Sequence, residues 1–133
     1  MARKKLLIDA HKMMLRQDSA GQHAHRERLK DSILQMEIAG LRKLSSDPFW
    51  FGETPTLVDV TFFPHVQRFA ALKHYRGFAL PNDCGRLRVW IDAMNALPVV
   101  QATKASEETL IRNWSKYAFN TSSGTTARDM RDI

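Results

Sequence analysis

The sequence lacks the features that mark secreted, disulfide-stabilised and membrane-spanning proteins. Among its 133 residues there is one cysteine, Cys84, so no intramolecular disulfide can form and nothing requires an oxidising compartment. The longest apolar run near the start, Leu6-Leu7-Ile8, is far too short for a signal segment or a membrane span. We therefore expect a cytoplasmic protein without a membrane partner, and its length suits a single domain.

Motifs for catalysis and metal binding are also missing. There is no H-E-x-x-H or paired-cysteine spacing, no Gly-rich phosphate loop and no G-x-S-x-G elbow. His23 and His25 lie two residues apart, which on a helix puts them on different faces, so we interpret them as solvated or capping residues. Cys84 stands at a predicted helix start, a position that can lower a thiol pKa. We expect no metal site in this chain.

Positive charge is in excess, yet it is not concentrated in one stretch. The formal net charge is +6 and the sequence pI is about 9.8. Neutralisation of phosphates by Lys and Arg supplies most non-specific nucleic-acid affinity, but that requires clustering. Here the basic residues are spread along the chain with Asp and Glu between them. We favour a solvated basic surface and do not expect a nucleic-acid partner.

Strand-like alternation and internal repeats are absent, and apolar residues recur instead at three- and four-residue spacing. The predicted fold class is all-α, a bundle of about five or six helices. The helices are expected at residues 1–16, 23–44, 57–72, 87–97, 99–103 and 106–118. A turn is expected at 17–22, and Asn82 or Asp83 is expected to cap the helix that contains residues 87–97. We assign 1–119 to the domain and expect the polar tail 120–133 to be disordered.

The first predicted helix begins unfavourably. Arg3, Lys4 and Lys5 stand where the helix dipole favours anions, whereas a helix usually opens with a cap and acidic residues. We therefore expect that the chain once continued upstream of Met1 or was cut there.

The central helix has the clearest start signal. Thr56 and Asp59 match a capping box, in which the threonine hydroxyl accepts from the N3 amide and the N3 carboxylate accepts from the N-cap amide. Beyond them no continuous polar stripe interrupts residues 57–72, which predicts a helix buried on most sides. Pro64 lies inside it and should kink it. Asp59 could also be a general acid or base, but its position already explains it as a cap.

The second predicted helix carries an unusual residue in its apolar row. Gly40 costs about 1 kcal/mol relative to Ala in a helix interior, which suggests the close approach of another helix. Glu37 is placed away from the apolar face. The following connector, residues 49–52, is expected to be buried, with Gly52 a candidate for positive φ.

The order of these elements resembles the C-terminal domain of the cytosolic glutathione S-transferases of bacterial type. The resemblance is spread over residues 1–118 and is carried by Pro48-Phe49-Trp50-Phe51-Gly52, Thr56-Leu57-Val58-Asp59 with Pro64 farther along, Tyr75-Arg76-Gly77-Phe78, and Leu87-x-x-Trp90-x-x-x-Met94-x-x-x-Pro98-x-Val100. In that family the capping box opens the buried helix that nucleates the domain. Pro55 and Val60 would occupy the family's hydrophobic staple positions.

The resemblance also implies what the chain lacks. A complete transferase has an N-terminal thioredoxin-like domain that binds glutathione and supplies the residue acting on its thiol, and no such segment is present in these residues. Glutathione is the family's co-substrate, and we expect no cofactor in this chain. Cys84 does not inherit the role of the family's nucleophilic cysteine. We expect the isolated chain to be inactive and to pair with a thioredoxin-like domain or with a second copy.

In the family the C-terminal domain forms the wall that contacts the hydrophobic electrophile. By position the resemblance maps this wall loosely onto Met13 and Met14, Arg68, and Trp114 or Tyr117. Each of these residues is also compatible with ordinary packing or with a surface position. The alternative function is a non-enzymatic interaction module of transferase-like fold, and a small helical nucleic-acid binder is the weakest alternative.

Overall fold

The computed structural model describes residues 2–125 and 128–129, and within them every regular element is helical. The elements are α1 (Ala2–Leu15), α2 (Ser19–Gln35), the π-helix η1 (Met36–Leu41), α3 (Arg42–Leu44), α4 (Leu57–Gln67), α5 (Phe69–Arg76), α6 (Gly85–Ala96), α7 (Pro98–Thr103) and α8 (Glu107–Ala118). Because α2, η1 and α3 are continuous and α4 and α5 are separated by one residue, the described elements form six helical units. The predicted all-α class is confirmed.

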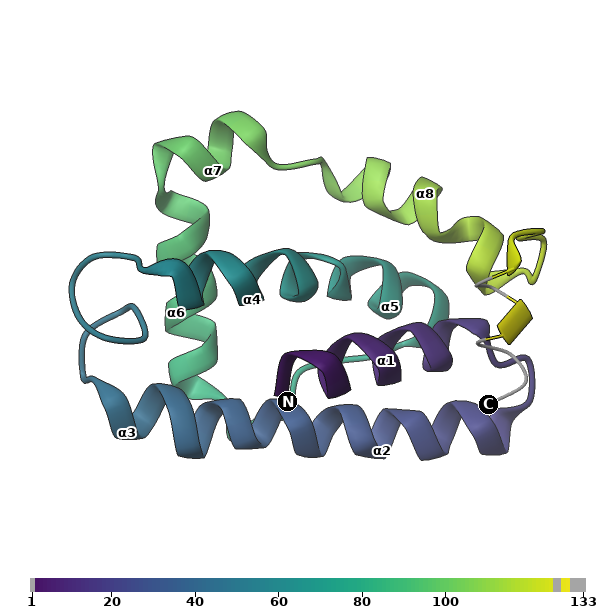
Figure 1. Ribbon diagram of the computed structural model, residues 1–133, viewed down its shortest axis with the longest axis horizontal. Helices are drawn as coiled ribbons and strands as arrows, with labels where there is room; N and C mark the ends of the chain where they lie inside the picture. Colours follow the sequence, from purple (N-terminus) through teal and green to yellow (C-terminus); the bar gives the residue numbers. More distant parts are fainter. Residues whose placement is uncertain (1, 126–127, 130–133) are drawn as a thin grey trace.

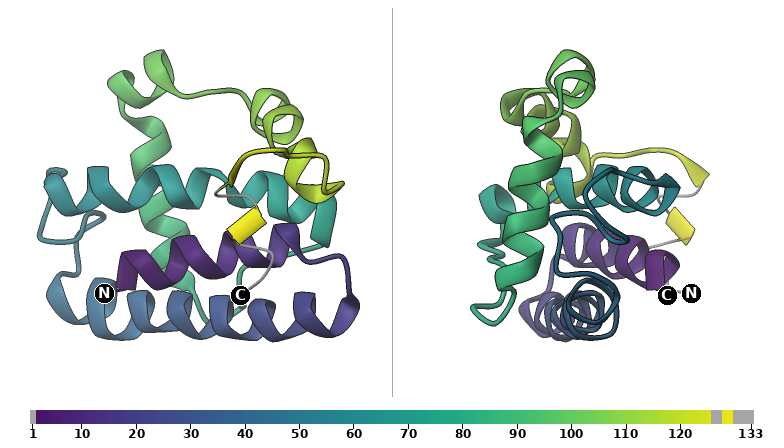
Figure 2. Two further views of the ribbon diagram at one scale, coloured as in Figure 1. Left: turned by 45° about the vertical axis from the view of Figure 1, so that its right-hand side comes forward. Right: turned by 90° about the vertical axis from the view of Figure 1, so that its left-hand side faces the viewer.

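The helices stack in layers around one core. In Figure 1, α1 lies along α2 in the opposite direction, and the α4–α5 unit lies along the other side of α1. Figure 2 shows α6 standing against one side of this stack, where it packs on η1 and α4. α8 returns to pack on α1 and α5. The largest fully buried side chains come from all these layers and include Met13, Met14, Leu29, Ile33, Leu72, Phe78, Leu87 and Trp90.

The second helix begins earlier than its apolar pattern predicts. α2 starts at Ser19, because Asp18 is its N-cap and the carboxylate Oδ2 accepts from the Gly21 N–H at 2.7 Å. The predicted turn over residues 17–22 was therefore wrong beyond Asp18. The first turns of α2 are polar, so the periodicity of apolar residues did not reach them.

A π-helical turn, η1, follows α2 and contains a buried acid. Glu37 lies in η1 and is 0% exposed, so its predicted place away from the apolar face was wrong. Its carboxylate accepts from the backbone N–H groups of Arg86 and Leu87, both at 2.7 Å. These are amides of the first turn of α6, and Glu37 thus caps that helix from a distant part of the chain. Neither Asn82 nor Asp83 is the N-cap, which is Cys84.

Gly40 also lies in η1, and the structure identifies what approaches it. A Cβ atom at this position would be 2.4 Å from a ring carbon of Trp50. The close approach predicted from Gly40 is thus made by the connector before α4 and not by another helix. Phe49 and Trp50 of that connector are buried, whereas Phe51 is 55% exposed.

The central unit divides at Arg68 into α4 and α5. A proline lacks the backbone N–H that would bond to the turn before it, so Pro64 weakens the helix on its N-terminal side. The break lies on the C-terminal side of Pro64, and the proline alone therefore does not explain it. The prediction of a helix buried on most sides was wrong for the outer face of α4, where Leu57 is 79% and Val60 58% exposed. The predicted disorder of 120–133 falls partly on 126–127 and 130–133, which lie outside the described residues.

Candidate functional site

The Asp59 carboxylate is the most connected buried acid of the described chain. Oδ2 accepts from the Thr56 N–H at 2.7 Å and from the Thr56 hydroxyl at 3.0 Å. Oδ1 accepts from the Trp50 N–H at 3.1 Å and from the Trp90 indole Nε1–H at 2.8 Å. Asp59 is 0% exposed, so no substrate reaches it. These bonds support a structural role for Asp59 over the general acid or base considered from the sequence.

A hollow of about 670 Å³ lies between α1 and the C-terminal end of α8, within the range typical of small-molecule sites. We call it the α1–α8 hollow. Its wall is mostly apolar along α1, and it is lined by Leu7, Ile8, His11, Leu15, Lys116, Tyr117, Thr121, Ser122, Ser123 and Gly124. Four of these positions, 7, 8, 11 and 15, recur at helical spacing on one face of α1.

His11 is held in one orientation at the wall of this hollow. Its Nδ1 is 2.9 Å from the Leu7 carbonyl oxygen, so Nδ1 carries the proton and Nε2 is left as an acceptor. Burial lowers the pKa of His11, the Leu7 hydrogen bond opposes that change, and the nearby Arg68 cation lowers it further. The imidazole is therefore neutral at physiological pH.

Two aromatic residues of α8 pack against His11. The ring centroids of His11 and Trp114 are 4.8 Å apart, and those of Trp114 and Tyr117 are 5.6 Å apart. Trp114 is 6% exposed and lies behind the wall, whereas Tyr117 lines the hollow. Arg68 is half-buried, and its charge acts on His11.

The structure brings only part of the proposed wall together. Arg68, Trp114 and Tyr117 surround His11, with Tyr117 at the hollow itself. Met13 and Met14 lie in the core instead, each 0% exposed, and so offer no atoms to a ligand. Sequence reasoning missed His11, although its spacing of four residues from both Leu7 and Leu15 places all three on one face of a helix.

Cys84 is not placed as a reactive thiol. It is 0% exposed, and burial together with the nearby Glu37 carboxylate raises its pKa. The lowered pKa considered for a cysteine at a helix start is therefore wrong here, because the Glu37 carboxylate occupies the first turn of α6. His25 is also buried, and its Nδ1 is 3.0 Å from Asp9 Oδ1, so its solvated or capping interpretation was wrong.

Five arginines, of the 20 basic residues in the sequence, donate hydrogen bonds to the protein's own backbone. These arginines donate to carbonyl oxygens at helix ends and in loops. A phosphate group could bind them only by displacing those oxygens. The five arginines are Arg26, Arg42, Arg76, Arg86 and Arg88. This use of the cations favours an intramolecular role over a nucleic-acid surface.

The described residues contain no group of three or more His, Cys, Asp or Glu side chains that could hold a metal ion. No helix within the same part of the chain has the length and apolar character needed to cross a membrane.

Part of the chain matches a known protein family. Residues 24–93 match the family described as "Glutathione S-transferase, C-terminal domain". The matched segment covers more than half of the chain and runs from α2 into α6, so it includes the connector, Asp59 and Trp90. No curated protein matches the chain.

Proposed function

The chain belongs to the glutathione S-transferase C-terminal domain family, and from this premise we propose that it supplies the wall for a hydrophobic electrophile in glutathione conjugation. The α1–α8 hollow is the proposed wall. One observation carries the assignment: a mostly apolar face of α1, the end of α8 and the segment 121–124, which are far apart in sequence, line one hollow of ligand size. Tyr117 supplies an aromatic surface and a hydroxyl, and His11 Nε2 supplies an acceptor.

The proposal assigns glutathione and the activation of its thiol to a thioredoxin-like domain and not to these residues. The chain's one thiol is buried and its pKa is raised, so it is a poor nucleophile. We propose that the chain alone is inactive and that it works in the cytoplasm, joined to such a domain or as a dimer. Val60 and Val99 are exposed and line one pocket, and a large exposed apolar patch is typical of a surface that a partner covers.

The electrophile wall can be tested by filling the hollow. Ser123 is exposed and lines it, so Ser123→Trp adds bulk without disturbing the core. The probe is 2,4-dinitrotoluene, an uncharged and unreactive analogue of an aryl electrophile, and binding is followed by calorimetry. Ser46→Trp is the matched control, because Ser46 is exposed and lines none of the described pockets.

We expect Ser123→Trp to weaken binding at least tenfold and Ser46→Trp to leave it unchanged. Conjugation is then measured with the chain joined to a thioredoxin-like domain, where the same variant should raise KM for the electrophile and leave KM for glutathione unaltered. Equal binding of 2,4-dinitrotoluene by both variants would show that the hollow is not the wall for the electrophile.

The alternative, a non-enzymatic interaction module, rests on the exposed outer face of α4. Leu57 and Val60 lie one turn apart there, and Val60 lines a pocket of about 340 Å³ together with Pro55 and Val99. Conjugation by the chain joined to a thioredoxin-like domain, with a KM for the electrophile that rises in Ser123→Trp, favours the transferase. Partner binding that is lost in Leu57→Asp, with no conjugation activity in the joined protein, favours the module.

A further inference from the structure

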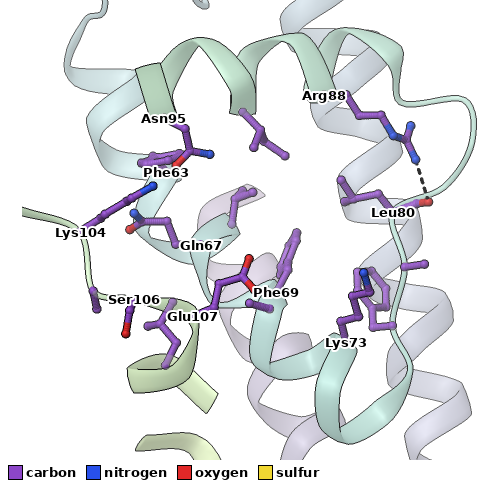
Figure 3. A pocket seen from close by; sticks show the side chains of 17 residues that line it. Phe63, Gln67, Phe69, Lys73, Leu80, Arg88, Asn95, Lys104, Ser106 and Glu107 are labelled. Carbon is purple, nitrogen blue, oxygen red and sulfur yellow. Dashed lines mark hydrogen bonds between the residues drawn. The ribbon is translucent and has the colours of Figure 1, made fainter. Parts of the chain in front are cut away.

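A second pocket of about 660 Å³ lies on a different side of the molecule from the α1–α8 hollow and shares no lining residue with it. Figure 3 shows this pocket, which we call the Lys104 pocket. It opens between the α4–α5 unit, the loop before α6, α6 itself and the segment that joins α7 to α8. Nothing in the proposed wall for the electrophile uses it.

The floor of the Lys104 pocket is apolar and well supported. Phe69 and Phe78 meet edge to face at 5.5 Å, and Ile91 and Leu110 complete the surface from α6 and α8. One side of the pocket is the loop that contains Leu80. Arg88 fixes this loop by donating to the Leu80 carbonyl at 3.2 Å and to the Pro81 carbonyl at 3.1 Å.

Cations without partners stand at the rim of the pocket. Lys73 and Lys104 both line it, and among the described residues neither ammonium has a hydrogen-bond or ion-pair partner. Glu107 is the one carboxylate of the lining, so the lysines and Arg88 outnumber it. An anion is therefore favoured there over a cation.

Polar groups converge on one end of this pocket. In Figure 3 the side chains of Lys104, Gln67 and Asn95 point into the pocket from the same end, and Lys73 lies at the other end. An ammonium and two amide groups supply hydrogen-bond donors for an oxyanion, and the phenylalanine floor begins beside them. The arrangement is that of small-molecule sites in general, an apolar cavity with a few placed polar groups.

We propose that the Lys104 pocket binds a small amphipathic carboxylate. Its apolar chain or ring lies over Phe69 and Phe78, and its carboxylate accepts from the Lys104 ammonium and from the amides of Asn95 and Gln67. A purely apolar molecule would leave these donors unused, and an organic cation would meet two unpaired ammonium groups. The proposal is independent of the electrophile wall, because it concerns other residues and another surface.

The test uses decanoate as the probe and the uncharged decan-1-ol as its matched ligand. Binding to the intact chain is followed by the backbone amide shifts of an ¹⁵N-labelled sample, which locate each ligand. We expect decanoate to shift amides around Lys73, Asn95 and Lys104, and to bind at least tenfold more tightly than decan-1-ol.

Three variants separate charge from shape. Lys104→Met keeps the length of the side chain and should weaken decanoate about tenfold while leaving decan-1-ol unchanged. Lys43→Met is the control, because Lys43 is exposed and lines none of the described pockets. Ala79→Trp, at an exposed position of the lining, should block both ligands at this pocket. Amide spectra of the free variants verify that each remains folded.

Three results would overturn the proposal. One is equal decanoate affinity in Lys104→Met and the parent protein. Another is decan-1-ol binding as tightly as decanoate, which would mean an apolar cavity without recognition of the carboxylate. The third is shifts confined to the α1–α8 hollow, around Tyr117, which would place the ligand at the other site.

Discussion

The indole N–H of Trp90 in α6 donates to the Asp59 carboxylate in α4 at 2.8 Å, across 31 positions of sequence. Both residues are 0% exposed, so the bond lies in the core. The other oxygen of the same carboxylate holds the Thr56 N–H at the start of α4. A signal that reads as a local helix start in the sequence is therefore also the attachment of α6 to α4.

Replacing Trp90 by Phe should remove this attachment. The loss of a buried hydrogen bond to a charged acceptor costs about 1.5–3 kcal/mol, in addition to the smaller ring. Trp50→Phe is the matched control: the Trp50 indole Nε1 is buried without a hydrogen-bond partner among the described residues, so the same substitution loses ring area only. Urea denaturation measures both. Equal destabilisation of the two variants would mean that the Asp59 bond contributes nothing.

Glu37 makes a comparable attachment between η1 and α6. Glu37→Gln leaves one carbonyl oxygen for two N–H groups, those of Arg86 and Leu87, and turns an amide N–H₂ toward one of them. We expect a loss of about 2–3 kcal/mol of unfolding free energy. Glu27→Gln should change stability by less than about 0.5 kcal/mol, because Glu27 makes only an exposed ion pair with Lys30. A loss in Glu27→Gln as large as in Glu37→Gln would contradict this role.

These two acids show how far the sequence leads. Asp59 was identifiable because its partner Thr56 is three residues away, whereas its bonds to Trp50 and Trp90 depend on how α4 and α6 pack. Glu37 lies four residues after the buried Ile33, so helical spacing already puts it on the inner face, and its charge rather than its position led to the prediction of an outer place. The starts of α2 and α6 depend on Asp18 and on the distant Glu37, which apolar spacing does not record.

The candidate site shows the same division. Tyr117 was placed on the wall by position in the chain, and it lines the hollow. Met13 and Met14 follow His11 by only two and three residues in α1. Their side chains nevertheless face the core, whereas His11 lines the hollow. The Lys104 pocket was beyond sequence reasoning, because its residues come from several helices and two connecting segments.

Adding a methyl group at Gly40 should test the approach of Trp50. Gly40→Ala gains helix propensity of about 1 kcal/mol but places Cβ 2.4 Å from the indole ring, and overpacking costs about 1–3 kcal/mol. We expect a net loss in thermal denaturation. Gly85→Ala, in the first turn of α6 with no atom within 4 Å of the new Cβ, should be neutral or stabilising. A stabilised Gly40→Ala protein would show that the ring moves aside without cost.

Stability should depend on pH through His11. Burial lowers the pKa of His11 below its ordinary value of 6.5, so near that pH the unfolded chain binds more protons than the folded one. The contribution of the neutral imidazole is therefore complete above about 6.5 and is lost as the pH falls from there toward the folded pKa. In His11→Gln the difference from the parent should shrink over this window. His23→Gln, at an exposed position, should follow the parent curve at every pH.

Arg76 and Gln17 both join the end of α1 to the end of α8 beside the α1–α8 hollow. The Arg76 guanidinium donates to the carbonyl oxygens of Met13 at 3.2 Å and Ala118 at 3.0 Å, which are at the C-terminal ends of α1 and α8. These are the ends of the two helices that enclose the hollow, and a guanidinium satisfies both because its donors form a fixed fork. Arg76→Lys keeps the charge but cannot span both ends.

We therefore expect Arg76→Lys to loosen the end of α8 more than it destabilises the whole domain. Hydrogen exchange should accelerate at least tenfold for the amides of Lys116 to Phe119, while amides in α2 change little. Binding of 2,4-dinitrotoluene should weaken in parallel, because the hollow loses one fixed side. Arg112→Lys is the control, because Arg112 is an exposed residue of α8. Unchanged exchange at the end of α8 in Arg76→Lys would show that α8 is held without Arg76, by the Gln17 amide on the Ala118 carbonyl at 3.0 Å and the Tyr75 hydroxyl on the Ile111 carbonyl at 2.7 Å.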